Sequence, residues 1–211
     1  MIVVGAKGFA KELLEVLIQL NKIKNLAFFD NVTKDVPKLL YNKFPILTSE
    51  EEVKIHFKNI DNKFALGIGE PQNRVVLTTL FQKLGGSLES IISSKATIGS
   101  FNNQIGIGST IMTGTIITND VQIGEGCLVN LNSTIGHDTI IGNFCELCPG
   151  VHISGNVQIG NGCFIGTGAV ILPGIKIGAN TIIGAGSLVT KNIPENSVAF
   201  GNPARIQPNK K

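Results

Sequence analysis

The chain has 211 residues and a formal net charge of +3, with basic and acidic side chains scattered along its length. This distribution provides no basic face for nucleic acid and no charged run for a membrane surface, so we expect neither partner. The amino-terminal segment lacks the basic flank and long apolar stretch of a signal peptide, and no apolar run approaches the roughly 20 residues of a membrane span. We therefore expect a cytoplasmic protein.

The first 90 residues alternate short apolar runs with segments of helical periodicity. Strands are predicted by apolar runs that end near glycine or aspartate: Ile2–Val4, Leu26–Phe29 and Phe64–Ile68. Helices are predicted by apolar spacing or by capping signals: Phe9–Leu20, a segment that begins at Thr48 or Ser49, and Glu70–Leu84. Alternating strands and helices predict a small parallel α/β domain of Rossmann type.

Two glycines follow the first predicted strand, at Gly5 and Gly8. Glycines at such a turn let backbone amides approach a phosphate, and the following helix start favours an anion. Asp30 ends the second predicted strand, where a nucleotide's ribose or base is held in folds of this type. The full GxGxxG pattern is absent, so a tight turn with a solvated aspartate remains the alternative.

From Ile105 to Val189, every sixth residue is Ile, Leu or Val without interruption. A period of six fits neither a helical stripe nor a lone amphipathic strand. It predicts a β-solenoid in which each hexad is a short strand and a corner, with the periodic residues stacked in a continuous core. Ile92 and Ile98 extend the pattern after a one-residue slip at Asn102–Gln104, so the solenoid is predicted from about residue 92 to about 190.

The four cysteines are Cys127, Cys145, Cys148 and Cys163. Cys127, Cys145 and Cys163 occupy the small inward slot of their hexads and are expected to be buried. The phase of the repeat places Cys148 on the outer side. Cys145 and Cys148 have the spacing of a metal or redox motif, but the solenoid phase favours free thiols in a reducing compartment.

The hexad repeat resembles the hexapeptide-repeat acyltransferases. That resemblance implies a left-handed parallel β-helix of triangular section, with three hexads in each coil, so that residues about 18 apart lie above one another at roughly 4.8 Å. The segment Gly201-Asn-Pro-Ala-Arg205 resembles the tail that closes such proteins beside coenzyme A. In physical terms it is also a turn that ends the solenoid and covers its last open strand edge.

The combination of a Rossmann-like domain (residues 1–90) with a solenoid domain and its closing segment (residues 91–211) resembles the family of sialic acid O-acetyltransferases and PglD-type nucleotide-aminosugar N-acetyltransferases. The segment from Asn132 to Phe144, which contains His137 and Asp138, carries the most specific resemblance. The family implies acetyl-CoA as co-substrate and a homotrimer with active sites between subunits. No metal site is expected, because the histidines are scattered.

The resemblance implies that His137 is the general base and that the Asp138 carboxylate raises its basicity. The sequence supports this role, because His137 falls at an outward corner and an imidazole accepts protons near neutral pH. Gly155 lies 18 residues later, so its N–H is expected beside His137 as a donor to the oxyanion. Direct attack without an acyl-enzyme is expected, because most of the thiols are predicted to be buried.

The remaining site residues follow from the resemblance. Contacts to acetyl-CoA are implied at Glu146, Gly155, Thr167, Ala185 and Arg205, and contacts to the acceptor at Gly5, Gly8, Asp30 and Gly69, with Arg74 beside Gly69. Glu146 replaces a second histidine found in many relatives, and it either binds the cofactor differently or faces solvent. His152 is a candidate substitute. The first turn reads Gly8-Phe9-Ala10 where relatives often have Gly-His-Gly.

These observations predict an acetyltransferase that acts on the amino group of a nucleotide-linked 4-amino-sugar. Two alternatives remain at this stage. One is an O-acetyltransferase for sialic acid or another sugar hydroxyl, and the other is a non-catalytic nucleotide-sugar-binding scaffold. The intact His137–Asp138 pair and Gly155 argue against the scaffold. The sequence leaves the base of the nucleotide open.

Overall fold

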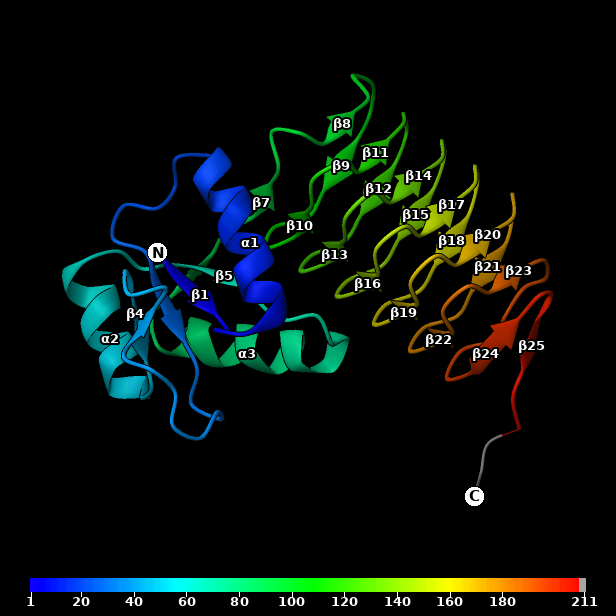
Figure 1. The fold of residues 1–211 in the computed structure, drawn as a ribbon. Coiled ribbons are helices and arrows are strands. Elements are labelled where there is room, and N and C mark those ends of the chain that lie inside the picture. Colours follow the sequence, from blue (N-terminus) through cyan, green and yellow to red (C-terminus); the bar gives the residue numbers. More distant parts are fainter. Residues whose placement is uncertain (209–211) are drawn as a thin grey trace.

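The computed structural model describes residues 1–208, which form an α/β domain followed by a solenoid of stacked coils (Figure 1). The chain passes from one part to the other between Leu88, in the last strand of the α/β sheet, and Ile91, in the first strand of the solenoid. Among residues 1–208, no helix is both long enough and apolar enough to cross a membrane.

The α/β sheet has six strands in the order β3-β4-β2-β1-β5-β6. Its strands are β1 (Ile2–Val4), β2 (Ala27–Phe29), β3 (Leu39–Leu40), β4 (Phe44–Leu47), β5 (Lys63–Leu66) and β6 (Ser87–Leu88). Its helices are α1 (Gly8–Gln19), α2 (Glu50–Asn59) and α3 (Pro71–Lys83). All strand pairs are parallel except β3 with β4, so the Rossmann-like domain is confirmed.

The helix starts agree with the capping signals in the sequence. The Ser49 side chain accepts a hydrogen bond from the N–H of Glu52, whose carboxylate accepts from the N–H of Ser49 in return. This reciprocal pair is a capping box, which satisfies two amides that the first turn leaves without partners. Sequence analysis missed β4 because Pro45 interrupts its apolar run, and proline is tolerated there beside the short edge strand β3.

The two faces of this sheet have different neighbours. On one face, α2 and α3 cover a cluster rich in aromatic side chains that includes Phe57, Phe64 and Phe81. On the other face, α1 packs between the sheet and the solenoid. Its residues Leu13 and Leu17 belong to one hydrophobic cluster with three solenoid residues: Ile91, Met112 and Leu128. The two domains therefore share a hydrophobic core.

The solenoid consists of three parallel sheets, as expected for a triangular β-helix. The first sheet contains β7 (Ile91–Ile92), β10 (Thr110–Ile111), β13 (Leu128–Val129), β16 (Glu146–Leu147), β19 (Phe164–Ile165), β22 (Ile182–Ile183), β24 (Val198–Gly201) and β25 (Ala204–Ile206). The second contains β8 (Thr97–Ile98), β11 (Ile116–Ile117), β14 (Thr134–Ile135), β17 (His152–Ile153), β20 (Val170–Ile171) and β23 (Leu188–Val189). The third contains β9 (Gln104–Ile105), β12 (Gln122–Ile123), β15 (Ile140–Ile141), β18 (Gln158–Ile159) and β21 (Lys176–Ile177).

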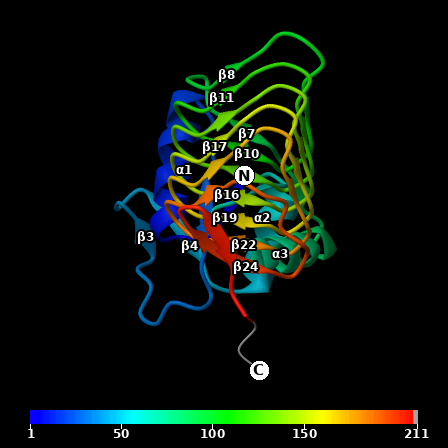
Figure 2. The same cartoon turned by 90° about the vertical axis from the view of Figure 1, so that its right-hand side faces the viewer.

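Strand register confirms the expected stacking. Ile135 pairs with Ile153, and Ile123 with Ile105, at the interval of 18 residues in each case. Ile117 pairs with Ile98 across one extra residue, which accommodates the predicted slip near Asn102. Figure 2 looks along the solenoid from its carboxyl-terminal end, so that the coils lie behind one another.

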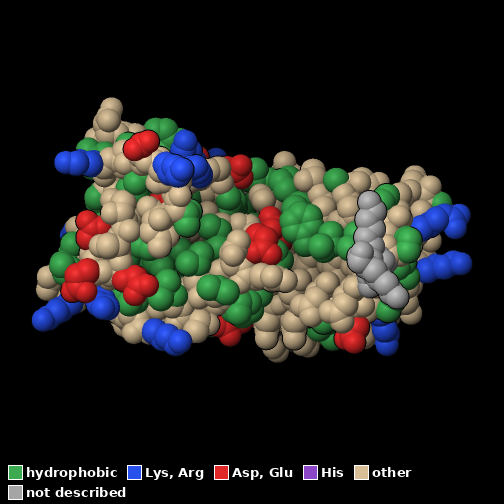
Figure 3. Space-filling view, turned by 90° about the horizontal axis from the view of Figure 1, so that it is seen from below, with side chains coloured by type: hydrophobic (Ala, Val, Ile, Leu, Met, Phe, Trp, Pro, Cys, Tyr) green, Lys and Arg blue, Asp and Glu red, His purple; other side chains and the backbone are tan. Residues whose placement is uncertain are grey.

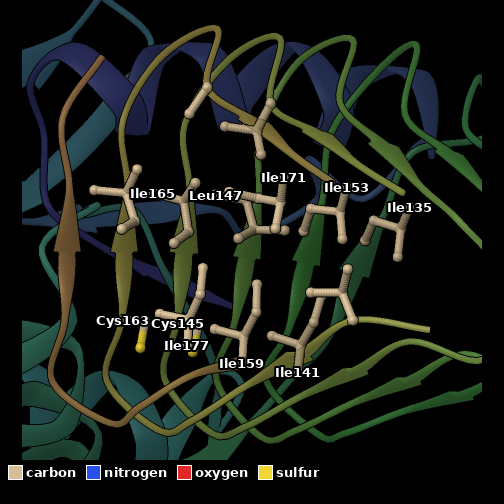
Figure 4. Packing of buried hydrophobic residues seen from close by; sticks show 14 of the residues in the cluster. Ile135, Ile141, Cys145, Leu147, Ile153, Ile159, Cys163, Ile165, Ile171 and Ile177 are labelled. Carbon is tan, nitrogen blue, oxygen red and sulfur yellow. The ribbon is translucent and has the colours of Figure 1, made fainter. Parts of the chain in front are cut away.

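The solenoid core has the composition that the repeat predicts. Figure 4 shows the inward residues of successive coils in rows, with the sulfur atoms of Cys145 and Cys163 side by side in neighbouring coils. Cys127 also lies in this core. The expectation for Cys148 was wrong: this thiol is buried as well, because it packs against Glu146 and the turn at Thr167. Burial, with the nearby Glu146 carboxylate, raises the pKa of Cys148 to about 12.

The carboxyl-terminal segment closes the last coil as predicted. Strand β24 pairs with β22 in parallel, and β25 folds back on β24 as an antiparallel partner. This hairpin occupies the edge that the last complete coil would otherwise expose.

The inward and outward positions of one strand provide a test of this core. Ile117 is 1% exposed, whereas its neighbour Ile116 is 46% exposed. Ile117→Ala should lower the free energy of unfolding by about 2–5 kcal/mol, because it leaves a cavity among the stacked residues. Ile116→Ala should cost less than about 1 kcal/mol. Urea denaturation of the two variants measures the difference, and equal losses would contradict the assigned phase of the repeat.

Candidate active site

A pocket of about 670 Å³ lies at the carboxyl ends of β1, β2 and β5. The chain runs from β1 toward β2 on one side of the sheet and reaches β5 on the other. Such a reversal of strand order is the usual ligand site of open α/β sheets. All four predicted acceptor-binding residues line this pocket: Gly5, Gly8, Asp30 and Gly69.

Glycine is required at the floor of the pocket. Gly5 has φ of +114°, and a methyl group added there would lie 2.7 Å from the carbonyl oxygen of Gly67. A methyl group on Gly67 would lie 2.5 Å from the side chain of Val3. The loops after β1 and β5 therefore approach as closely as two backbones can, and any larger residue would separate them.

The start of α1 faces the same pocket. Gly8 is the first helical residue, and the preceding Lys7 makes no side-chain hydrogen bond to the first turn. Uncapped amides at a helix start, with Lys7 and Lys34 among the lining residues, suit a phosphate group.

Asp30 is 5% exposed, so it is not the solvated aspartate of the alternative interpretation. Its Oδ1 accepts hydrogen bonds from the N–H groups of Val32 and Thr33, and its Oδ2 accepts from the Thr33 hydroxyl. Burial alone would raise the pKa of this carboxyl, but the hydrogen bonds from Thr33 and Val32 outweigh it and hold the pKa below its usual value. Asp30 therefore shapes the loop after β2, and its contact with a nucleotide stays a prediction.

His137 and Asp138 occupy the corner between β14 and β15. The His137 Nδ1 lies 2.6 Å from the Asp138 Oδ2, and the two side chains are 69% and 59% exposed. An ionised carboxylate only accepts hydrogen bonds, so Nδ1 carries the proton of the neutral imidazole and Nε2 is free to accept one. The pair thus has the arrangement of a general base with its orienting carboxylate.

Gly155 stacks on this corner one coil later, as the repeat predicts. A methyl group added to Gly155 would lie 2.5 Å from the His137 Nε2. Within residues 1–208, the Gly155 N–H has no hydrogen-bond acceptor. The reason lies in the sequence: at an equivalent corner the Asn143 side chain accepts from the N–H of Glu125, but the residue one coil after Gly155 is Pro173.

Glu146 lies on the outer side of β16, where the solenoid meets the α/β domain. It is 8% exposed, which excludes the alternative that it faces solvent. A methyl group added at Gly69 would lie 2.5 Å from its Oε1, so the carboxylate touches the wall of the pocket. Burial raises the pKa of Glu146, and the nearby charge of Arg74 opposes that shift. Sequence analysis misjudged the environment because it could not foresee the docking of the α/β domain.

The sequence suggested that Arg74 contacts the acceptor, but Arg74 does not line the pocket. Its side chain is fully buried behind the Gly67–Gly69 loop and donates hydrogen bonds to backbone carbonyls of both domains. His152 is exposed on β17 and its Nδ1 lies 2.9 Å from the Thr134 hydroxyl, on the outer side of the second sheet.

Thr167 and Ala185 stack at a different corner, between the first and second sheets, and the exposed Arg205 belongs to β25. Within one chain the structure therefore brings Gly155 to His137, but not the other predicted acetyl-CoA residues: Glu146, Thr167, Ala185 and Arg205. A shallow, mainly apolar groove of about 670 Å³ lies on the third sheet, and its lining includes Ile140, Gln158, Lys176 and Asn192. Sequence analysis missed this groove, whose one signal is an aliphatic residue, Ile140, at an outward position.

Charge is unevenly distributed on the surface. Figure 3 shows Lys and Arg side chains toward the two ends of the molecule as seen from below, with acidic side chains both among them and between them. In the described part of the chain, no group of three or more His, Cys, Asp or Glu residues is arranged to hold a metal ion.

Comparison with known proteins identifies both domains. The model of the PglD N-terminal domain matches residues 1–80, and the bacterial transferase hexapeptide model (six repeats) matches residues 156–191. The comparison with curated proteins found no match.

Solved structures resemble the chain over nearly its whole length. A mutant of perosamine N-acetyltransferase from Caulobacter crescentus, in complex with CoA and GDP-perosamine, is 28% identical, with a TM-score of 0.90 and coverage of 99% of this chain and 96% of that one. The acetyltransferase domain of PglB from Neisseria gonorrhoeae is 28% identical, with a TM-score of 0.86 and coverage of 98% of each chain.

WeeI from Acinetobacter baumannii AYE is 30% identical, with a TM-score of 0.88 and coverage of 98% of this chain and 100% of that one. The fold of these relatives agrees with the left-handed β-helix that was expected from the hexad repeat and its resemblance to the hexapeptide-repeat acyltransferases. With an α/β domain that matches the PglD model and a relative that it covers completely, the chain belongs to the PglD-type family of hexapeptide-repeat acyltransferases.

Proposed function

We propose that this protein transfers the acetyl group of acetyl-CoA to the amino group of a nucleotide-linked amino-sugar. The observation that carries the proposal is the His137–Asp138 pair, whose Nε2 lies beside Gly155, a residue whose N–H has no acceptor within residues 1–208. It is supported by a relative of similar fold that holds CoA and GDP-perosamine, an amino-sugar nucleotide, and by a further PglB structure in complex with acetyl coenzyme A.

The pocket of the α/β domain suits the nucleotide end of this acceptor. The start of α1 and the lysines Lys7 and Lys34 supply positive charge for a diphosphate. The close approach of Gly5 to Gly67 leaves backbone on the pocket floor, where phosphate oxygens can come near. The sugar would then extend from the pocket past Gly69.

The chemistry of the corner suits acetyl transfer. The amine attacks the thioester carbonyl while the His137 Nε2 takes up its proton, and the Asp138 carboxylate stabilises the imidazolium that forms. The Gly155 N–H donates to the oxygen that becomes negative. When the carbon–sulfur bond breaks, the CoA thiolate leaves and can regain the proton from His137. All four thiols are buried, which favours this direct route over an acyl-enzyme.

A single chain does not provide the complete site. Neither His137 nor Gly155 lines the nucleotide pocket, and Thr167 and Ala185 lie at another corner of the solenoid. We therefore propose a homotrimer in which the His137 corner faces the Thr167–Ala185 corner of the next subunit, with acetyl-CoA between them. We expect the protein to act in the cytoplasm, where four unpaired thiols remain reduced.

The release of CoA from acetyl-CoA tests the proposal. The purified protein is assayed with nucleotide-linked 4-amino-sugars on different bases, with the matching 4-hydroxy sugars, and with free sialic acid. Turnover is expected only with amino-sugar nucleotides. Turnover with the hydroxyl acceptors would favour the O-acetyltransferase, and failure to bind acetyl-CoA would favour the scaffold.

The replacement His137→Ala should lower kcat by roughly 100- to 10,000-fold, which is the usual loss when a general base is removed. Binding of acetyl-CoA should change little, because the imidazole side chain is exposed and packs against no core residue. His152→Ala is the matched comparison, since that histidine bonds Thr134 on another surface. An equal loss in both variants, or none in His137→Ala, would remove His137 from the mechanism.

The replacement Gly155→Ala places a methyl group where only 2.5 Å separates it from the His137 Nε2. It should lower kcat by roughly 100-fold or more, because the base and the oxyanion donor are both obstructed. The affinity for the nucleotide, which binds in the other domain, should be unchanged. Steady-state kinetics and isothermal titration measure the two quantities. Full activity in this variant would show that the corner is not the reaction centre.

A further inference from the structure

The junction between the two domains contains a fully buried guanidinium. Arg74, near the start of α3, has no exposed surface. Its Nη1 donates to the carbonyl of Ile68 at 2.6 Å, its Nε to the carbonyl of Gly126 at 2.7 Å, and its Nη2 to the carbonyl of Cys127 at 3.3 Å. The first of these carbonyls belongs to the α/β domain and the other two belong to the solenoid.

This arrangement depends on the shape of arginine. The planar guanidinium presents its donors in a fixed fork, so one side chain can hold backbone groups that lie on two sides of it. A lysine ammonium is a point donor and cannot span the same carbonyls. Burial lowers the pKa of Arg74 to about 10, which leaves it charged at neutral pH.

Such a buried charge is not explained by stability alone. Removing a cation from water costs several kcal/mol, and apolar replacements of buried ion groups are often as stable. Within residues 1–208, no carboxylate lies within ion-pair distance of Arg74, although the charge of Glu146 acts on it from nearby. The direct partners of Arg74 are therefore backbone carbonyls, and Arg74 fixes the positions of those carbonyls relative to one another.

The backbone that Arg74 holds is a wall of the nucleotide pocket. Ile68 lies between Gly67 and Gly69, and all three residues line that pocket. Inside its own domain the loop is tied to β1 by the hydrogen bond from the Gly67 N–H to the Val4 carbonyl. Toward the solenoid it is held by the Arg74 fork and by the contact of Gly69 with Glu146.

We propose that Arg74 is a positioning residue that sets the distance and angle between the acceptor pocket and the solenoid that carries the acetyl-transfer corner. The inference rests on the proposed function, because it concerns how the amine of a bound acceptor reaches the thioester. Arg74 touches neither substrate. It acts through the Gly67–Gly69 loop and through Gly126–Cys127.

The kinetic test separates positioning from binding. In Arg74→Lys the loop keeps its tie to Val4, so the nucleotide should bind within about threefold of the wild-type affinity. The pocket loses its fixed place on the solenoid, and kcat should fall roughly 10- to 100-fold, since a misplacement of about 1 Å can cost 100-fold. The KM for acetyl-CoA should stay within about threefold. Lys83→Met, an exposed change near the end of the same helix, is the control and should match wild type in all three quantities.

A second variant tests the same junction without changing the buried guanidinium. Gly69→Ala adds a methyl group 2.5 Å from the Glu146 Oε1, which pushes the loop away from the solenoid while Arg74 remains. It should reproduce the loss in kcat. If Arg74→Lys fails to fold, this variant alone decides the question.

Hydrogen exchange supplies a readout that needs no turnover. The amides of the Gly67–Gly69 loop should exchange at least about tenfold faster in Arg74→Lys than in wild type or Lys83→Met, because local opening of the loop becomes easier. Unchanged exchange would overturn the proposal, as would a folded variant with wild-type kcat or one whose nucleotide affinity falls in proportion to kcat. Absence of turnover in the wild-type protein would instead count against the proposed function.

Discussion

The packing of inward aliphatic residues on their counterparts one coil away is the interaction on which this structure depends. Ile135 can be buried only if Ile153 lies on one side of it and Ile117 on the other, and the parallel ladders hold them in that register. A slip of one residue would turn every inward side chain outward. The register therefore determines the corners as well as the core. It is the reason that Gly155 stands over His137, although 18 residues separate them in the sequence.

A second constraint follows from the outer side of the first sheet. Its strands β13 and β16 carry Leu128 and Glu146 outward, and an uncovered Leu128 would leave apolar surface in contact with water. The α/β domain covers this surface: α1 packs on Leu128, and the loop at Gly69 covers Glu146. The same docking places the pocket at the ends of β1, β2 and β5 beside the solenoid. The docking that buries the outer side of the first solenoid sheet therefore also places the pocket next to the solenoid.

The sequence predicts features that have a local period or a local signal. The hexads predict the solenoid, the slip near Asn102 and the burial of Cys145, and the Ser49 capping signal predicts the start of α2. The environments of Cys148, Glu146 and Arg74 could not be predicted in the same way. Each lies where two elements meet, and the burial of a position there depends on which surface docks on it. Asp30 illustrates the same limit, because its hydrogen bonds depend on the conformation of the loop that follows.

Acetyl transfer and selection of the acceptor differ in how much structural change they tolerate, and the fold assigns them to different parts of the chain. Acetyl transfer needs a base, an oxyanion donor and a thioester within hydrogen-bonding distance of one another, and the ladders on both sides of His137 would supply that rigidity to the proposed base. Selection of an acceptor needs a pocket whose loops can differ from one relative to the next, and the loops after β1, β2 and β5 line the pocket without belonging to the coils. A change in those loops leaves the register of the coils intact. The acceptor specificity can therefore change between relatives without loss of acetyl transfer, provided that the junction keeps the pocket at the same place on the solenoid.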